Sequence, residues 1–127
     1  MKVFDSSAVL AVLFDEPGAE QAIRWLEDDD ALISSVNHAE VLAKLLDRGL
    51  SEAEITAIGQ QLPLQVVPFS AQQARTAASL RPATRALGLS LGDRCCLALA
   101  SEQPGAQVVT ADRPWAGLAG FDIALIR

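Results

Sequence analysis

Four acidic residues are the strongest candidates for chemistry in this sequence: Asp5, Glu40, Asp93 and Asp112. Carboxylates that meet in a folded protein repel one another, so some of them must bind protons or share a cation. Mg²⁺ and Mn²⁺ are hard cations that prefer carboxylate and water oxygens. Such an ion can lower the pKa of a bound water and neutralise the charge that develops on a phosphate during displacement. If the four side chains converge, we therefore expect a divalent metal site suited to attack on a phosphate.

Two of these acids follow predicted strands. Asp5 comes directly after the apolar segment Lys2–Phe4, and Asp112 comes two residues after the segment Gln107–Thr110. In open α/β sheets, ligands bind beyond the carboxyl ends of the strands, near the point where the strand order reverses. We therefore expect Asp5 and Asp112 at the same edge of a sheet.

The other two acids lie near the starts of predicted helices. Glu40 falls in the second turn of a helix from Ser35 to Leu46, and Asp93 falls in the first turn of a helix that begins at Ser90. In a right-handed crossover, the helix starts at the edge where the preceding strand ends. All four carboxylates can therefore meet, although they are far apart in the sequence.

Short β-branched segments alternate with helical ones along the chain. The predicted strands are Lys2–Phe4, Ala31–Ser34, Leu64–Phe69, Gln107–Thr110 and Ile123–Ile126. The predicted helices begin near Ala8, at Ala19, at Ser35, at the capping boxes Ser51–Glu54 and Ser70–Gln73, and at Ser90, with an interruption at Arg81-Pro82. This alternation predicts one α/β domain over residues 1–127, a three-layer α/β/α sandwich around a mostly parallel sheet of four to five short strands.

Each acid also has a structural interpretation. Aspartate commonly ends strands and begins turns, so Asp5 or Asp112 alone could be structural. Asp93 could partner Ser90 in a helix cap, and Glu40 could be a solvated helix residue. Only the joint placement of the four acids favours a functional site.

The charge distribution bears on possible polyanionic partners. The net charge is −6, which does not favour nucleic-acid binding. Residues 1–60 contain 12 acids and 4 bases, whereas residues 61–127 contain 4 acids and 6 bases. A local basic face is therefore possible in the second half, and Arg85 and Arg94 are candidates for contacting a phosphate backbone.

The sequence favours the cytoplasm as the compartment. The longest unbroken apolar run, Ala8 to Phe14, is far too short to span a membrane. Asp5 lies where a signal peptide would have its apolar stretch. The adjacent pair Cys95-Cys96 does not have the geometry of an ordinary disulfide and suits a reducing environment.

Four segments of the sequence resemble the PIN-domain family, in particular the VapC-type ribonuclease toxins of bacterial toxin–antitoxin pairs. They occur in the family's order and spacing: Val3-Phe4-Asp5-Ser6-Ser7-Ala8, Ser35-Val36-Asn37-His38-Ala39-Glu40-Val41, Leu89-Ser90-Leu91-Gly92-Asp93-Arg94-Cys95-Cys96-Leu97-Ala98-Leu99-Ala100, and Val108-Val109-Thr110-Ala111-Asp112. Each motif is weak alone, but four in succession are fairly specific.

The resemblance implies a PIN-like nuclease domain that cuts RNA phosphodiester bonds with Mg²⁺ or Mn²⁺. It implies that Asp5, Glu40, Asp93 and Asp112 are the catalytic and metal-binding quartet. Ser6 and Thr110 match family positions that support the site by hydrogen bonding. The resemblance further implies a homodimer and a cognate antitoxin whose tail occupies the active-site groove.

Two other functions fit parts of the pattern. An aspartate-based phosphotransferase also has an Asp after its first strand, but it carries a second Asp two residues later, where this chain has Ser7. A catalytically silent PIN-like module for RNA or protein binding would be expected to lack one of the acids, and none is missing. His38 points to a different helix face from Glu40, which favours a packing or surface role.

Overall fold

The computed structural model describes residues 1–127, and its core is one parallel β-sheet. The five strands lie in the order β3-β2-β1-β4-β5, and every neighbouring pair is parallel. Their bounds are β1 (Lys2–Phe4), β2 (Ala31–Ser34), β3 (Gln65–Val67), β4 (Gln107–Thr110) and β5 (Asp122–Leu125). The predicted fold class is confirmed. β3 is shorter than predicted, and β5 begins and ends one residue earlier.

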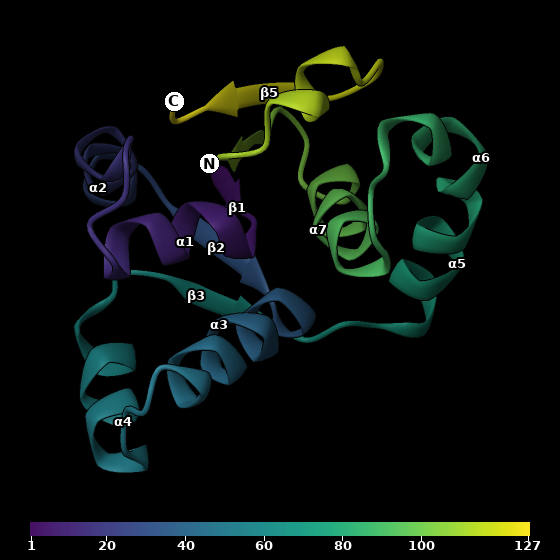
Figure 1. Ribbon diagram of the computed structural model, residues 1–127. Coiled ribbons are helices and arrows are strands. Elements are labelled where there is room, and N and C mark those ends of the chain that lie inside the picture. Colours follow the sequence, from purple (N-terminus) through teal and green to yellow (C-terminus); the bar gives the residue numbers. More distant parts are fainter.

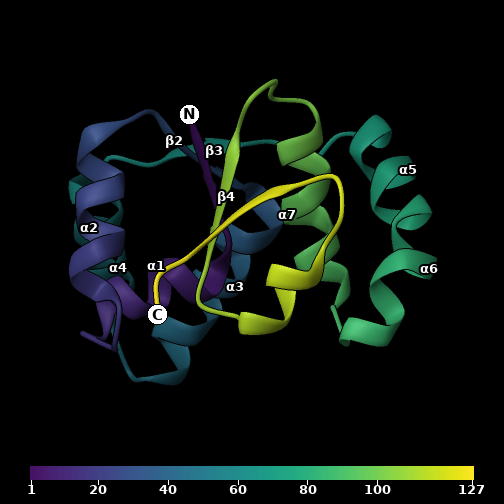
Figure 2. The ribbon, with the colours of Figure 1, turned by 90° about the horizontal axis from the view of Figure 1, so that it is seen from above.

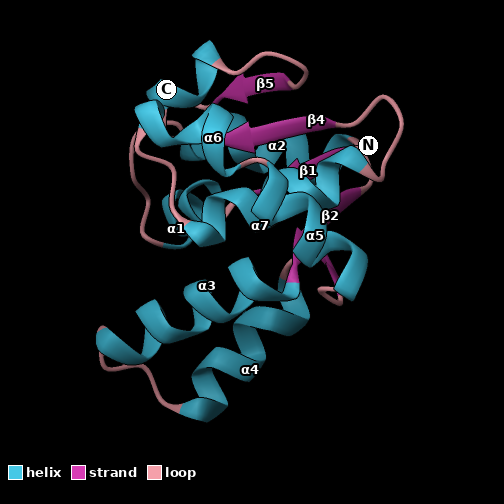
Figure 3. Cartoon of the chain, turned by 90° about the vertical axis from the view of Figure 1, so that its right-hand side faces the viewer, coloured by secondary structure: helices cyan, strands magenta, loops and turns pink.

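Helices cover both faces of this sheet, so the molecule has three layers. The helices are α1 (Ser6–Leu13), α2 (Ala19–Asp28), α3 (Ser35–Asp47), α4 (Glu52–Gln61), α5 (Ala71–Ser79), α6 (Arg81–Thr84) and α7 (Leu91–Ser101), with short 3₁₀ helices η1 (Arg85–Leu87) and η2 (Arg113–Gly117). In Figures 1 and 2, α1 and α2 lie on one side of the strands and α5, α6 and α7 on the other. Figure 3 shows α3 and α4 as a helical hairpin that extends beyond the sheet.

Alternation along the strands divides the buried side chains into two cores. Phe4 and Val109 face α1 and α2, whereas Val3 and Val108 face α7 and η2. Successive residues of a strand point to opposite faces, so a strand that is apolar on both faces must be covered on both. All these side chains are fully buried. Short apolar strands therefore fix the position of β1 and β4 at the centre of the molecule.

The helix starts depend on polar side chains that bind free backbone N–H groups. Ser51 and Glu54 form the predicted capping box at the start of α4. The second predicted box is only half formed, because Ser70 accepts from the Gln73 N–H while the Gln73 side chain binds Glu102 instead. Helix α1 begins at Ser6, earlier than expected, because Asp5 serves as its N-cap.

The predicted interruption at Arg81-Pro82 is present between α5 and the four-residue helix α6. Proline lacks a backbone N–H and is tolerated in the first turn of a helix, where that N–H has no intrahelical partner. Pro82 accordingly lies in the first turn of α6. The short helices α6 and η1 thus connect α5 to α7.

The strand order places the site. From β1 the chain moves outward through β2 to β3, and it then crosses to β4 and β5 on the other side of β1. The order therefore reverses between β1 and β4, and Asp5 and Asp112 follow these two strands.

No helix in the structure is long and apolar enough to cross a lipid bilayer.

Candidate metal centre

Asp5 lies at the centre of the site and is almost completely buried, with 1% of its surface exposed. Its Oδ1 accepts hydrogen bonds from Ser7 Oγ at 2.7 Å and from the Ala8 N–H at 3.0 Å. Its Oδ2 accepts from Thr110 Oγ1 at 2.8 Å. Burial raises the pKa of Asp5 to about 7, although these three hydrogen bonds act in the opposite direction and Asp112 adds a smaller upward contribution. The protein thus holds a carboxylate where its charge is poorly solvated.

Two hydroxyl groups connect Asp5 to the end of β4. Thr110 Oγ1 donates to Asp5 and accepts from the Asp112 N–H at 3.0 Å. Ser7 Oγ donates to Asp5 and accepts from the Ala111 N–H at 3.0 Å. Each hydroxyl can donate once and still accept, so both serve as bridges. These bridges fix the backbone that carries Asp112 relative to Asp5.

Asp93 combines the two roles considered for it: it caps a helix, and it belongs to the group of acids at the site. Ser90 and Asp93 form a capping box at the start of α7, in which Asp93 Oδ2 accepts from the Ser90 N–H at 2.8 Å. Asp93 Oδ1 has no hydrogen-bond partner in the protein. The cap therefore orients the side chain and leaves one oxygen free.

Asp5, Asp93 and Asp112 each place a carboxylate oxygen within 4.8 Å of the others. Burial raises the pKa of Asp112, and the charge of Asp93 raises it further, against a smaller opposite effect of Arg127. None of the four predicted acids forms a salt bridge, since the ion pairs of this protein involve only Met1, Lys2 and Asp29. Three close oxygen donors that form no salt bridge are a donor set that fits Mg²⁺ or Mn²⁺.

Glu40 lies outside this group of three, which differs from the expected convergence of four acids. It is exposed on α3, and its Oε1 accepts from Asn37 Nδ2 at 2.9 Å. Its carboxylate lies against Gly92, the residue before Asp93. Glu40 is therefore a neighbour of the site rather than part of its densest cluster. Glu40 lies apart from the other three acids because α3 follows β2, which is one strand away from the β1–β4 pair.

The supporting hydroxyl on α1 comes from a different serine than expected. We expected Ser6 to support the site by hydrogen bonding, but Ser7 donates to Asp5 and Ser6 makes no side-chain hydrogen bond. Ser6 is the first residue of α1, directly after the Asp5 N-cap, whereas Ser7 points back to the cap. Thr110 does make the expected contact. Ser7 also occupies the position where an aspartate-based phosphotransferase needs its second carboxylate, so that alternative gains nothing from the structure.

Sequence reasoning also missed Asn37 and Gly92. Asn37 is buried, and its amide nitrogen donates to Glu40 and to the Gly92 carbonyl. A signal was available for Asn37, because residues three apart on a helix are neighbours and an amide can donate to a carboxylate. Gly92 gave no such signal, since its role depends on the packing of α3 against α7.

The two candidate arginines have different environments. Arg94 is buried between α5 and α7, and its Nη1 donates to the Ala77 carbonyl at 2.9 Å. The guanidinium of Arg94 is therefore directed toward α5 rather than toward solvent, which does not support the predicted contact with a phosphate backbone. Arg85 is exposed in η1. This short helix contacts η2, which begins directly after Asp112.

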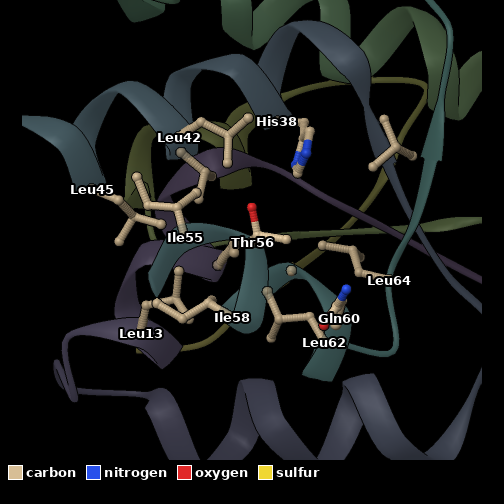
Figure 4. Close-up of a pocket in the computed structure, with 14 residues that line it drawn as sticks. Leu13, His38, Leu42, Leu45, Ile55, Thr56, Ile58, Gln60, Leu62 and Leu64 are labelled. Carbon is tan, nitrogen blue, oxygen red and sulfur yellow. The ribbon is translucent and has the colours of Figure 1, made fainter. Parts of the chain in front are cut away.

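A separate apolar pocket of about 240 Å³ lies among α1, α3, α4 and β3. Figure 4 shows His38 on its wall, with Leu42, Ile55 and Leu64 among the surrounding side chains. None of the four acids lines this pocket. His38 therefore lines this pocket and lies outside the group of three acids. Of the two tryptophans, Trp115 is buried in the core beside α7, and Trp25 packs at the edge of the other core.

The comparisons with known proteins agree with this geometry. The sequence profile of the PIN domain matches residues 2–120. The chain therefore belongs to the PIN-domain family. A comparison with curated protein sequences found no match.

Several solved structures share the fold over essentially the whole chain. A toxin–antitoxin complex from Klebsiella pneumoniae is 19% identical with a TM-score of 0.76, over 100% of this chain and 98% of that one. DNA-bound VapBC from Salmonella typhimurium is 16% identical with a TM-score of 0.75, over 100% of both chains. FitAcB from Neisseria gonorrhoeae is 19% identical with a TM-score of 0.72, over 99% of this chain and 98% of that one. At these identities the likeness establishes the shared fold.

Proposed function

We propose that this protein is a Mg²⁺- or Mn²⁺-dependent endoribonuclease and the VapC-type toxin of a toxin–antitoxin pair. The observation that carries the proposal is the group formed by Asp5, Asp93 and Asp112, whose oxygens lie within 4.8 Å of one another. Two of these acids have raised pKa values, and none of the three forms a salt bridge. A divalent ion would compensate this charge, and the family and fold fit the same function.

In this proposal Asp5, Asp93 and Asp112 hold the ion, and Glu40 stands at the edge of the centre. The bound ion would activate water and neutralise charge on the phosphodiester. The chain's own groups perform the positioning. Ser7 and Thr110 hold both oxygens of Asp5, and the Ser90 cap fixes one oxygen of Asp93. Prior fixation of the carboxylates lowers the cost of assembling the site.

Arg85 is the proposed phosphate contact. It is exposed on η1, and η1 contacts the segment that follows Asp112. In this proposal an RNA strand that enters the site would pass η1 and meet Arg85. A cation there would offset the negative net charge of the protein locally.

The proposed partners are a cognate antitoxin and a second copy of the chain, in the cytoplasm. Three of the structural relatives are described as a toxin–antitoxin complex, VapBC and FitAcB. An antitoxin tail that covers the acidic site would block access of RNA.

The test compares the purified wild type with Asp5→Asn prepared in parallel. Cleavage of single-stranded and hairpin RNA is followed with Mg²⁺, with Mn²⁺ and with a chelator, and a DNA of the same sequence serves as substrate control. We expect metal-dependent cleavage of RNA by the wild type alone. Equal cleavage by both proteins, each freed of contaminating nuclease, would refute the proposal. Metal binding without cleavage would favour the catalytically silent module.

The biological part of the proposal needs a cellular experiment. Wild type and Asp5→Asn are expressed under a tightly controlled promoter, and new RNA 5′ ends are mapped across the transcriptome. We expect growth arrest and a defined set of new ends with the wild type only. Normal growth and no new ends would contradict a toxin function.

A further inference from the structure

Asn37 connects the exposed acid Glu40 to the start of α7. The Asn37 side chain is 1% exposed, and its Nδ2 donates to Glu40 Oε1 and to the Gly92 carbonyl, both at 2.9 Å. Its Oδ1 is buried without a hydrogen-bond partner. Rotating the amide by half a turn would place this oxygen against two other oxygens, so the two acceptors determine the orientation. A single amide group thus ties a carboxylate on α3 to the backbone of α7.

Gly92 acts on the same carboxylate from the other helix. A Cβ atom on Gly92 would lie 2.5 Å from Glu40 Oε2 and 2.9 Å from Glu40 Cδ. Gly92 lies within α7 and does not have the positive φ angle that requires glycine. Its missing side chain therefore provides space, and the Glu40 carboxylate fills that space.

We propose that Asn37 and Gly92 are positioning residues that hold the Glu40 carboxylate against the first turn of α7, and that this placement strengthens divalent-cation binding at the acidic centre. The inference rests on the proposed metal-dependent function. A purely structural link between α3 and α7 would need only the bond from Asn37 to the Gly92 carbonyl. The second N–H, directed at Glu40, and the space left at Gly92 both act on an exposed carboxylate, which such a link does not require.

The sharpest test is Gly92→Ala, because it displaces Glu40 without removing a hydrogen-bonding group. Alanine favours a helix more than glycine does. The atoms in its way belong to the end of a flexible side chain. We expect a thermal midpoint equal to or above that of the wild type, and Mn²⁺ binding to the full chain weaker by about 10-fold, as is typical when a group behind a metal site is lost. Isothermal titration and electron paramagnetic resonance of free Mn²⁺ give the affinity without any assay of cleavage.

Gly59→Ala is the matched control for Gly92→Ala. Gly59 is an exposed residue of α4, and a Cβ there would meet nothing within 4 Å. Gly59→Ala makes the same chemical change in a helix away from the acids. We expect a similar gain in helix stability and an unchanged Mn²⁺ affinity.

A double-mutant cycle separates positioning from a general effect on the fold. Glu40→Ala should weaken Mn²⁺ binding by a similar factor of about 10. Adding Gly92→Ala to Glu40→Ala should then weaken it no further, because the displaced carboxylate is already gone. Effects that multiply in the double variant would overturn the proposal, since independent sites behave additively in free energy.

Asn37→Leu tests the other positioning residue, because leucine has nearly the same shape and no donor. We expect a loss of Mn²⁺ affinity that again disappears in the Glu40→Ala background. Gln73→Leu is its control. Gln73, on α5, is also a buried amide with an unpartnered oxygen, and its nitrogen donates to Glu102 at the C-terminal end of α7. It should lower the thermal midpoint and leave Mn²⁺ affinity unchanged.

The outcomes distinguish this inference from the function on which it rests. A wild type that binds no Mn²⁺ at millimolar concentration would defeat the metal centre itself. A wild type that binds Mn²⁺, with Gly92→Ala folded and binding equally well, would defeat only the positioning role. If Asn37→Leu does not fold, Gly92→Ala and its cycle with Glu40→Ala still decide the question.

Discussion

The two sides of the acidic site hold their carboxylates in different ways. On the β1–β4 side, Asp5 is buried and receives hydrogen bonds from two hydroxyls and a backbone N–H. On the α3–α7 side, Glu40 is exposed and receives one hydrogen bond from Asn37. A buried charge strongly affects both stability and pKa, whereas an exposed charge is screened by solvent. From this difference we expect changes on the β1–β4 side to affect mainly the rate of RNA cleavage. Changes on the α3–α7 side should affect mainly the affinity for the divalent ion.

The largest effect should come from Asp5→Asn. The variant removes a charge from the centre but keeps a side chain suited to the helix N-cap. We expect cleavage of RNA to fall by about 1000-fold, corresponding to roughly 4 kcal/mol of lost stabilisation of the reaction. Single-turnover rates at saturating Mn²⁺ measure this loss. A fall of only a few-fold, with the fold intact by circular dichroism, would place the chemistry elsewhere.

The same residue should make the metal-free protein less stable as the pH rises. The pKa of Asp5 is raised from 3.8 to about 7, so the folded protein binds a proton more tightly than the unfolded chain does. The contribution of Asp5 to stability is therefore fully present below about pH 4 and is lost as the pH rises through 7, by at most about 4 kcal/mol. Urea unfolding with a chelator, compared between wild type and Asp5→Asn at pH 5 and 8, isolates this contribution. Identical pH profiles of the two proteins would contradict it.

Thr110→Val should have a smaller effect on the same side of the site. It removes the hydroxyl that donates to Asp5 and accepts from the Asp112 N–H. Leaving these buried partners unpaired should cost about 1–3 kcal/mol of unfolding free energy. Because the lost bond favoured ionised Asp5, its pKa should also rise further. Thr76→Val, on an exposed turn of α5 where the hydroxyl binds only the Gln72 carbonyl, is the control and should change little.

The smallest effect should come from the exposed residue Arg85. Arg85→Glu should weaken RNA binding by a few-fold and reduce the salt dependence by about one phosphate contact. Arg75→Glu, on the exposed surface of α5, is the matched change. Fluorescence anisotropy with Asp5→Asn as background measures binding without cleavage. An equal loss from both arginine variants would indicate only net charge.

The sequence by itself determined the architecture and three of the four acids that were expected to meet, whereas Glu40 lies outside their group. Short strands that are apolar on both faces require helices on both sides, so Val3 and Phe4 alone already indicate two cores. Asp5 and Asp112 follow strands, and strand ends in a parallel sheet share an edge. These inferences hold because they depend on local periodicity and on the direction of the strands.

Only the tertiary structure decided which neighbours hold these acids. Whether Ser6 or Ser7 reaches Asp5 depends on where α1 begins, which Asp5 itself determines as the N-cap. The burial of Arg94 and the space that Gly92 leaves for Glu40 depend on how α5 and α3 pack against α7. Side-chain contacts between helices follow from close packing of the whole chain, and no spacing along one segment encodes them.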